Sequence, residues 1–131
     1  NTMRLTVAHE FFHAIERSYR STPTNVVNDT YFWEMSSTWI EDIIVPNGDD
    51  YLFWTDDFLN NPDQNISNTD GYSIALFGHY LANIVDNTSN QMESTIMRKI
   101  WETYSYLLSP AFYSMDIVLQ NDYQTDFSNS F

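Results

Sequence analysis

The chain has 131 residues, of which 43% are hydrophobic and 17% aromatic, enough for one domain with a buried core and too many for a disordered chain. Eighteen Asp and Glu residues against five Lys and Arg residues give a formal net charge of −13, which disfavours nucleic acids and anionic membrane surfaces as partners. The sequence shows no membrane span and no signal peptide, and its lack of cysteine excludes disulfides and thiolate metal sites.

Two helices are predicted in the first third of the chain. Residues 2–19 contain no Gly or Pro, and their apolar residues recur at helical spacing. The polar segment 21–25, which contains Pro23, is typical of a loop. A second helix is predicted from Asp29 and ends before Pro46.

The rest of the chain is also predicted to be helical. We expect a short helix that ends near Phe58, a polar loop over 60–71, an apolar helix over 72–85, a helix from Ser89 or Asn90 to Leu108, and a last helix from Pro110 to about Leu119. The segment 121–131 is polar, and we expect it to be poorly ordered. The sequence therefore predicts an all-α domain over 1–120, followed by a tail over 121–131.

The first predicted helix contains the sequence His-Glu-Phe-Phe-His at positions 9–13. Residues four apart lie on one face of a helix, so His9 and His13 can share one metal ion, of which Zn²⁺ is the typical case. Glu10 lies next to the first histidine and is expected to act as the general base that takes a proton from water. We expect Val7, Phe11 and Ile15, among other apolar neighbours, to bury this helix.

A catalytic zinc site needs a third protein ligand. Metzincins supply a further His at fixed spacing, but the corresponding Gly and His positions hold Glu16 and Tyr19 here. His79 is a weaker candidate, because a lone histidine on an apolar helix is more often a core or surface residue. Glu34 is favoured, because the second helix can pack antiparallel to the first and direct its carboxylate at the two histidines.

The segments AHEFFHAI at 8–15 and FWEMSSTWIED at 32–42 resemble the core of the gluzincins, zinc peptidases with an HExxH motif and a downstream Glu. The similarity is greatest to secreted bacterial metallopeptidases and more distant to the aminopeptidase N and thermolysin branches. It covers roughly residues 6–46, with a weaker likeness over 72–101. Thr38 stands where thermolysin-like enzymes carry an Asp, whereas Glu41 matches the aminopeptidase-like pattern.

The resemblance implies a zincin-like domain with zinc on His9, His13 and Glu34 and with Glu10 as the base. It also implies a peptide or protein substrate and a secreted or extracytoplasmic location. The chain begins almost at the motif, so we expect the β-sheet of such a domain to lie upstream of it. Peptide specificity, endo- or exopeptidase action and oligomeric state stay open.

Two further residues are candidates for the site. Glu41 follows Glu34 by two helical turns and could accept the second N–H of a ligand histidine, although it could equally be a surface acid. Tyr72 opens a helix after the long loop, and its hydroxyl could donate to the oxyanion of a tetrahedral intermediate, although ordinary aromatic packing is the simpler alternative.

The sequence thus favours a zinc-dependent peptidase that hydrolyses peptide bonds through activated water. Two other classes stay open. One is a non-catalytic binding or structural module that keeps the zinc fold, which the presence of Glu10 disfavours because a structural site needs no base. The other is a metal-free helical interaction domain.

Overall fold

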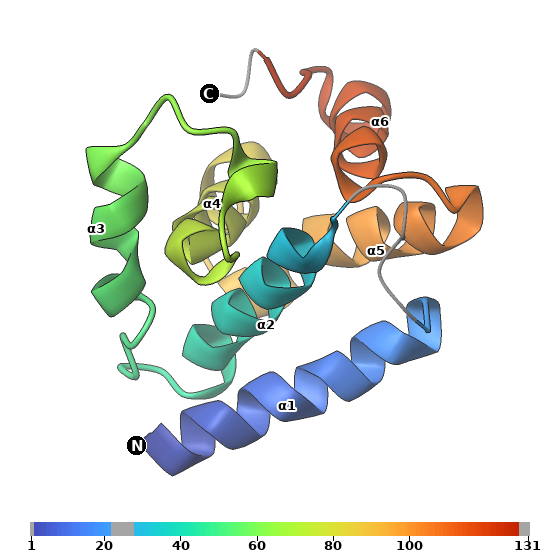
Figure 1. Cartoon of the computed structure of the whole chain (residues 1–131). Coiled ribbons are helices and arrows are strands. Elements are labelled where there is room, and N and C mark those ends of the chain that lie inside the picture. The colour runs from blue at the N-terminus through green and yellow to red at the C-terminus, as the bar shows by residue number, and fades with distance from the viewer. Residues whose placement is uncertain (1, 22–27, 129–131) are drawn as a thin grey trace.

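A computed structural model describes residues 2–21 and 28–128, and these residues contain helices and loops but no strand, which confirms the predicted all-α class for this part of the chain. Figure 1 shows the arrangement of the elements. In chain order they are α1 (Thr2–Tyr19), α2 (Thr30–Ile44), α3 (Leu52–Asn60), η1 (Ile66–Asn68), η2 (Tyr72–Ile74), α4 (Ala75–Tyr80), η3 (Leu81–Val85), η4 (Gln91–Glu93), α5 (Ile96–Leu107) and α6 (Ala111–Tyr123).

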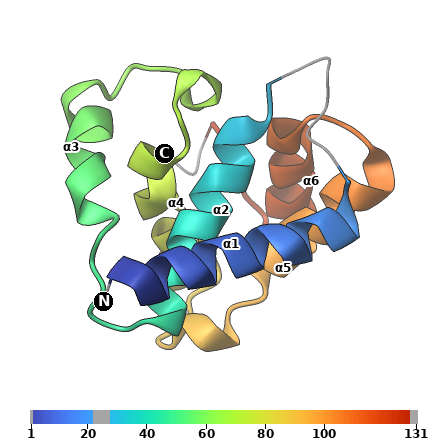
Figure 2. The same cartoon turned by 60° about the horizontal axis from the view of Figure 1, so that its bottom comes forward.

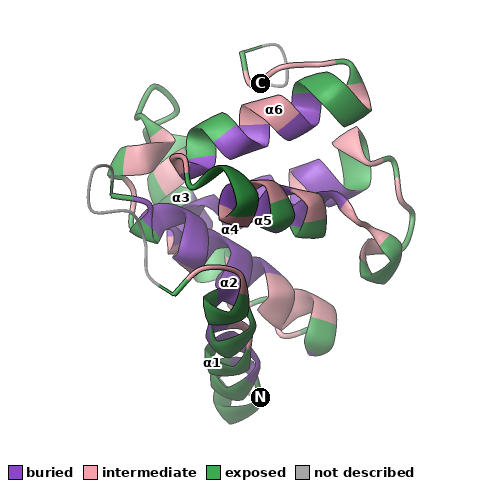
Figure 3. Cartoon of the chain, turned by 90° about the vertical axis from the view of Figure 1, so that its right-hand side faces the viewer, coloured by how far each residue is buried: buried purple, intermediate pink, exposed green. Residues whose placement is uncertain are grey.

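The second helix, α2, lies at the centre of the fold. Figure 3 shows it buried along most of its length, and its large side chains form the core together with residues of α4, α5 and α6. Helix α1 crosses α2, as Figures 1 and 2 both show, and in the view of Figure 1 it runs in roughly the opposite direction. The bounds of both helices agree with the sequence prediction. This pairing brings the HExxH face of α1 against α2.

Helix α1 is buried on a narrower face than the sequence predicted. Its buried residues are Leu5, Ala8, His9, His13 and Glu16. The expectation that Val7, Phe11 and Ile15 are buried is wrong, because they are 63%, 62% and 37% exposed. The apolar residues of α1 lie on two faces, and only the face that carries the two histidines packs against α2.

The segment 72–85 is helical as predicted, but it is not one regular helix. A 3-10 turn, the α-helical turns of α4 and the π-helical turns of η3 follow one another without a gap. Gly71 precedes them with a φ of +94°, a conformation that side-chain-bearing residues rarely adopt. A Cβ at this position would lie 2.4 Å from the backbone oxygen of Tyr31 and 2.6 Å from Cβ of Glu34, so only glycine allows this approach to α2.

Helix α5 begins later than predicted, and its N-terminus is capped by Asp86, a residue outside the helix. Asp86 accepts hydrogen bonds from the Ser94 hydroxyl and from the backbone N–H groups of Thr95 and Ile96. The segment predicted to open this helix forms the separate 3-10 turn η4 instead. A cap from a preceding loop lacks the usual signal of a capping side chain directly before the helix.

The last helix, α6, extends to Tyr123, beyond the predicted end near Leu119. The tail predicted from residue 121 therefore begins inside this helix. Phe127 packs edge-on against Phe112 at 4.5 Å between ring centroids, and its backbone N–H donates to Asp116. Within residues 2–21 and 28–128, no helix combines the length and the apolar character needed to cross a membrane.

Candidate metal centre

The centre forms where the buried face of α1 meets α2. His9 and His13 lie one helical turn apart on α1, and their rings contact each other edge to face at 4.6 Å between centroids. Glu34 projects from the first half of α2 toward both rings. Its Oε2 atom lies 3.1 Å from Nε2 of His9 and 3.5 Å from Nε2 of His13. One ligand atom from each of these residues can be chosen so that all three lie within 4.8 Å of one another.

A carboxylate stands behind each imidazole. Nδ1 of His9 lies 2.5 Å from Oε1 of Glu41, and Nδ1 of His13 lies 2.6 Å from Oε2 of Glu16. An ionised carboxylate only accepts hydrogen bonds, so each Nδ1 carries a proton and donates it. The Nε2 atoms are thereby left to face Glu34. Glu41 thus has the position that the sequence suggested for a residue that orients a histidine.

Glu16 is a site residue that the sequence analysis missed. It is completely buried, and besides His13 it accepts hydrogen bonds from the hydroxyls of Ser36 at 2.6 Å and Ser37 at 3.1 Å. A buried carboxylate is costly unless its oxygens are paired, and these three donors from two helices meet that need. The signal was present in the sequence, because Glu16 follows His13 by three residues and so lies on the same helical face.

The charged groups of the site are paired with one another. Burial would lower the pKa of His9, but its hydrogen bonds to Glu34 and Glu41 raise it to about 9. Hydrogen bonds to Glu16 and Glu34 likewise raise the pKa of His13 to about 9, against the effect of burial. Burial opposes ionisation of Glu34, but hydrogen bonds from His13, His9 and Tyr72 hold its pKa well below the usual range.

Tyr72 lies beside the same group. Its ring stacks on His9 at 5.7 Å between centroids with an interplanar angle of 7°, and its hydroxyl is hydrogen-bonded to Glu34. Burial and the charge of Glu34 raise the pKa of Tyr72 above its usual range, so the phenol keeps its proton and can donate. The close approach of Gly71 to α2 sets this position.

Glu10 is exposed at the edge of the centre. It follows His9 on α1, and its negative charge contributes to the raised pKa of Tyr72. Its carboxylate is outside the three-residue group formed by His9, His13 and Glu34. This exposure suits a group that exchanges protons with water.

His79 is not part of the centre. Its Nδ1 contacts Oε1 of Gln91 at 2.8 Å, and its Nε2 lies 3.8 Å from the carboxylate of Asp42. In the part of the chain that the structure describes, the only group of three His, Asp or Glu residues close enough to hold a metal ion is His9, His13 and Glu34.

The donor set of the centre fits a divalent transition metal. Two imidazole nitrogens and one carboxylate oxygen are the three-ligand set found in catalytic zinc sites, where a fourth position stays open. The carboxylates at Nδ1 of both histidines are the outer partners that such ligands almost always have. The residues present therefore satisfy both the ligand shell and its hydrogen-bonded support.

No protein-family model, curated protein or solved structure matches this chain.

Proposed function

We propose that the chain is a zinc-dependent peptidase in which His9, His13 and Glu34 bind the metal. The observation that carries this proposal is the orientation of the two imidazoles. Each is held at Nδ1 by a carboxylate, so both Nε2 atoms are directed at the carboxylate of Glu34. Apolar residues would stabilise the contact between α1 and α2 at least as well as buried or half-buried charged groups. Five such groups lie there instead: His9, His13, Glu16, Glu34 and Glu41.

Zinc supplies Lewis acidity at such a site, which polarises a carbonyl group and lowers the pKa of water. Glu10 is exposed next to His9 and can accept the proton of the attacking water, then pass it to the leaving amine. Tyr72 keeps its proton and lies beside Glu34, so its hydroxyl can donate to the oxyanion that develops during attack.

The choice of a peptide as substrate rests on the motif and on charge. The spacing of Glu10 within HExxH is the one in which zinc peptidases carry their base. The formal net charge of −13 would repel the phosphates of a nucleic acid. The likeness to secreted bacterial metallopeptidases favours an extracytoplasmic protein and a zincin-like domain.

The Glu10→Gln variant of the full chain tests the proposal. With mixed quenched-fluorescence peptides as substrates, we expect hydrolysis to be abolished while zinc content stays near one per chain, because Glu10 is a base and not a ligand. Tyr72→Phe, which removes only the hydroxyl, should lower kcat by roughly 10²–10³ with a smaller effect on KM. Asp57→Asn, which changes an exposed carboxylate on α3, is the matched control.

Three results would contradict the proposed function. Loss of zinc from Glu10→Gln would make Glu10 a ligand, and unchanged hydrolysis by this variant would remove its role as base. A wild-type chain that binds zinc but cleaves no peptide in the mixture would instead be a non-catalytic zinc module.

A further inference from the structure

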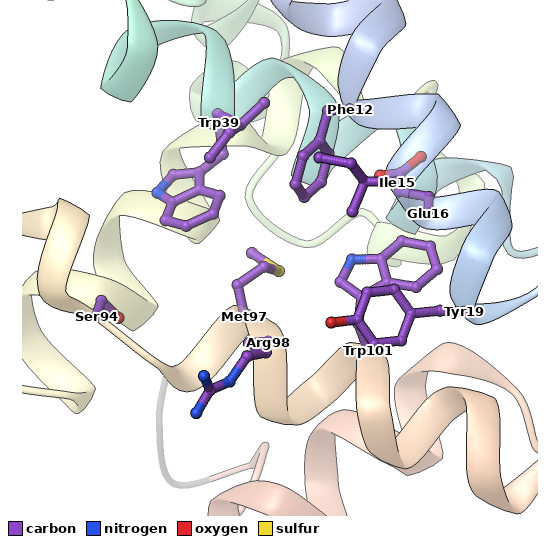
Figure 4. A pocket seen from close by; sticks show the side chains of 10 residues that line it. Phe12, Ile15, Glu16, Tyr19, Trp39, Ser94, Met97, Arg98 and Trp101 are labelled. Atoms are coloured by element: carbon purple, nitrogen blue, oxygen red, sulfur yellow. The ribbon is translucent and has the colours of Figure 1, made fainter.

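A cavity of about 240 Å³ lies between α1, α2 and α5. Figure 4 shows its lining, which is mostly apolar: Phe12 and Ile15 from α1, Trp39 from α2, and Met97 and Trp101 from α5. Its volume is below the roughly 300–1,000 Å³ of sites for drug-sized ligands, so its occupant would be a smaller molecule. The cavity is separate from the metal-binding group, none of whose three residues lines it.

The wall of the cavity contains an unused hydrogen-bond donor. Trp101 is only 2% exposed, and its indole N–H is buried without a partner among the described residues. The indole groups of Trp33 and Trp39 are paired, with the Tyr104 hydroxyl and with Gln91 respectively. Figure 4 shows the nitrogen of Trp101 on the side of the ring that faces Met97 and the open space of the cavity. A buried donor of this kind is rare unless a ligand or water completes it.

The rim of the cavity carries a positive charge. Arg98 lines it and is one of only five Lys and Arg residues in a chain with eighteen acids. Glu16 also lines the cavity, but its carboxylate is already engaged by His13, Ser36 and Ser37. Arg98 forms an exposed ion pair with Glu102, with 3.6 Å between Nε and Oε1, and solvent screens this pair. The Trp101 N–H in the wall and the Arg98 cation at the rim both favour a negatively charged acceptor.

We propose that this cavity binds a small apolar carboxylate, such as a medium-chain fatty acid. The hydrocarbon chain contacts Phe12, Trp39 and Met97, and a carboxylate oxygen accepts the N–H of Trp101. Arg98 adds a charge at the rim that distinguishes a carboxylate from a neutral or cationic head group. This binding does not depend on the zinc site.

Octanoate binding to the full chain tests the proposal, with a chelator present to keep the metal site out of the measurement. The chain has four tryptophans, so its ¹⁵N spectrum has four indole N–H signals, and Trp101→Phe identifies the one that belongs to Trp101. We expect octanoate to shift this signal saturably. Octanol should bind more weakly, and octylamine should leave the signal in place.

Two variants set the expected size of the effect. Trp101→Phe should weaken octanoate binding, measured by calorimetry, about two- to tenfold, because it removes one hydrogen-bond donor. Arg98→Gln should weaken it about two- to fivefold, since this side chain is 62% exposed and its charge is screened. Arg17→Gln is the matched control, because Arg17 is an exposed residue of α1 that does not line the cavity. The Arg17→Gln variant should bind octanoate with the same affinity as the wild type.

Four results would overturn the proposal. In the spectra, these are a Trp101 signal that does not shift saturably, and equal shifts of all four indole signals, as a detergent would cause. In the affinities, they are equal binding of octanoate and octylamine, and equal binding of octanoate by the Arg98→Gln and Arg17→Gln variants.

Discussion

The surroundings of two buried histidines differ although both contact α2. His13 and His79 are 9% and 6% exposed. His13 has a carboxylate behind its Nδ1 and the Glu34 carboxylate in front of its Nε2, with His9 alongside. His79 has the amide of Gln91 behind its Nδ1, and its Nε2 faces Asp42 at 3.8 Å, beyond hydrogen-bond length.

This contrast shows what distinguishes a group that could hold a metal ion from a single buried histidine. The oxygen of Gln91 accepts from both Trp39 and His79, so His79 carries its proton on Nδ1, as His13 does. Both imidazoles therefore donate a hydrogen bond from Nδ1. His79 has one carboxylate, that of Asp42, near its Nε2, but among the described residues no second imidazole completes a three-residue group there. Burial of a histidine alone does not provide such a group.

The comparison predicts its largest difference when each histidine is replaced. His13→Asn should lower zinc affinity by more than the roughly 10–100-fold that loss of an outer partner costs, because it removes a ligand. His79→Asn should leave zinc affinity unchanged. Calorimetric zinc titration of both variants against the wild type measures the difference, and equal losses would mean that zinc binding reflects only the stability of the fold.

The carboxylate of Glu16, which binds Nδ1 of His13, can be replaced by an amide like that of Gln91, which binds Nδ1 of His79. Glu16→Gln keeps the volume of this completely buried side chain but removes its charge, and it should weaken zinc binding by roughly 10–100-fold. Glu41→Gln should have an effect of the same order. Asp42→Asn, next to Glu41 on α2, is the control. Unchanged zinc affinity in Glu16→Gln would show that this buried carboxylate serves only to join α1 to α2.

The backbone that positions Tyr72 can be disturbed without touching a ligand. Gly71→Ala places a Cβ 2.4 Å from the oxygen of Tyr31 and forces alanine into a positive φ, which alone costs roughly 1–2 kcal/mol. We expect a lower melting temperature and weaker zinc binding, because Glu34 lies against this glycine. Gly48→Ala is the control, since its nearest new contact is the flexible end of Leu5. Similar losses in both variants would argue against a specific role of Gly71.

The smallest expected effect is on the pH dependence of stability. In the metal-free chain the pKa values of His9 and His13 are raised from 6.5 to about 9, so their pairing stabilises the fold fully below pH 6.5 and is lost as the pH rises through about 9. The melting temperature with chelator should therefore fall between these pH values. Glu41→Gln removes a partner of His9 and should flatten the decline. A wild-type melting temperature that stays constant between pH 6.5 and about 9 would contradict the pairing of these charges.

The sequence was sufficient to predict the helix pair and the three residues His9, His13 and Glu34 that meet in the centre. Helical spacing alone brings His9 and His13 onto one face, and the loop between two amphipathic helices allows Glu34 to reach them. The structure brings these three residues together, with Glu41 behind His9 and Tyr72 stacked on it. The resemblance to gluzincins and the enzymatic roles stay predictions.

Other features depend on contacts between distant segments. The spacing of Glu16 from His13 places both on one helical face, but the burial of Glu16 depends on Ser36 and Ser37, which lie on another helix. Helix α5 starts later than predicted, and Asp86 caps it from outside the helix. The exposure of Phe11 shows that an apolar residue on a helix need not face the core, since only the packing of α1 on α2 determines which apolar face is covered.

The central claim is that His9, His13 and Glu34 converge on one zinc ion. The most direct measurement is zinc content together with zinc X-ray absorption of the full chain. We predict one zinc per chain with nitrogen and oxygen ligands at about 2.0–2.1 Å and a signal from two imidazoles, one of which disappears in His13→Asn. A chain without stoichiometric zinc after incubation with the metal, or one whose zinc keeps two imidazoles in His13→Asn, would contradict the claim.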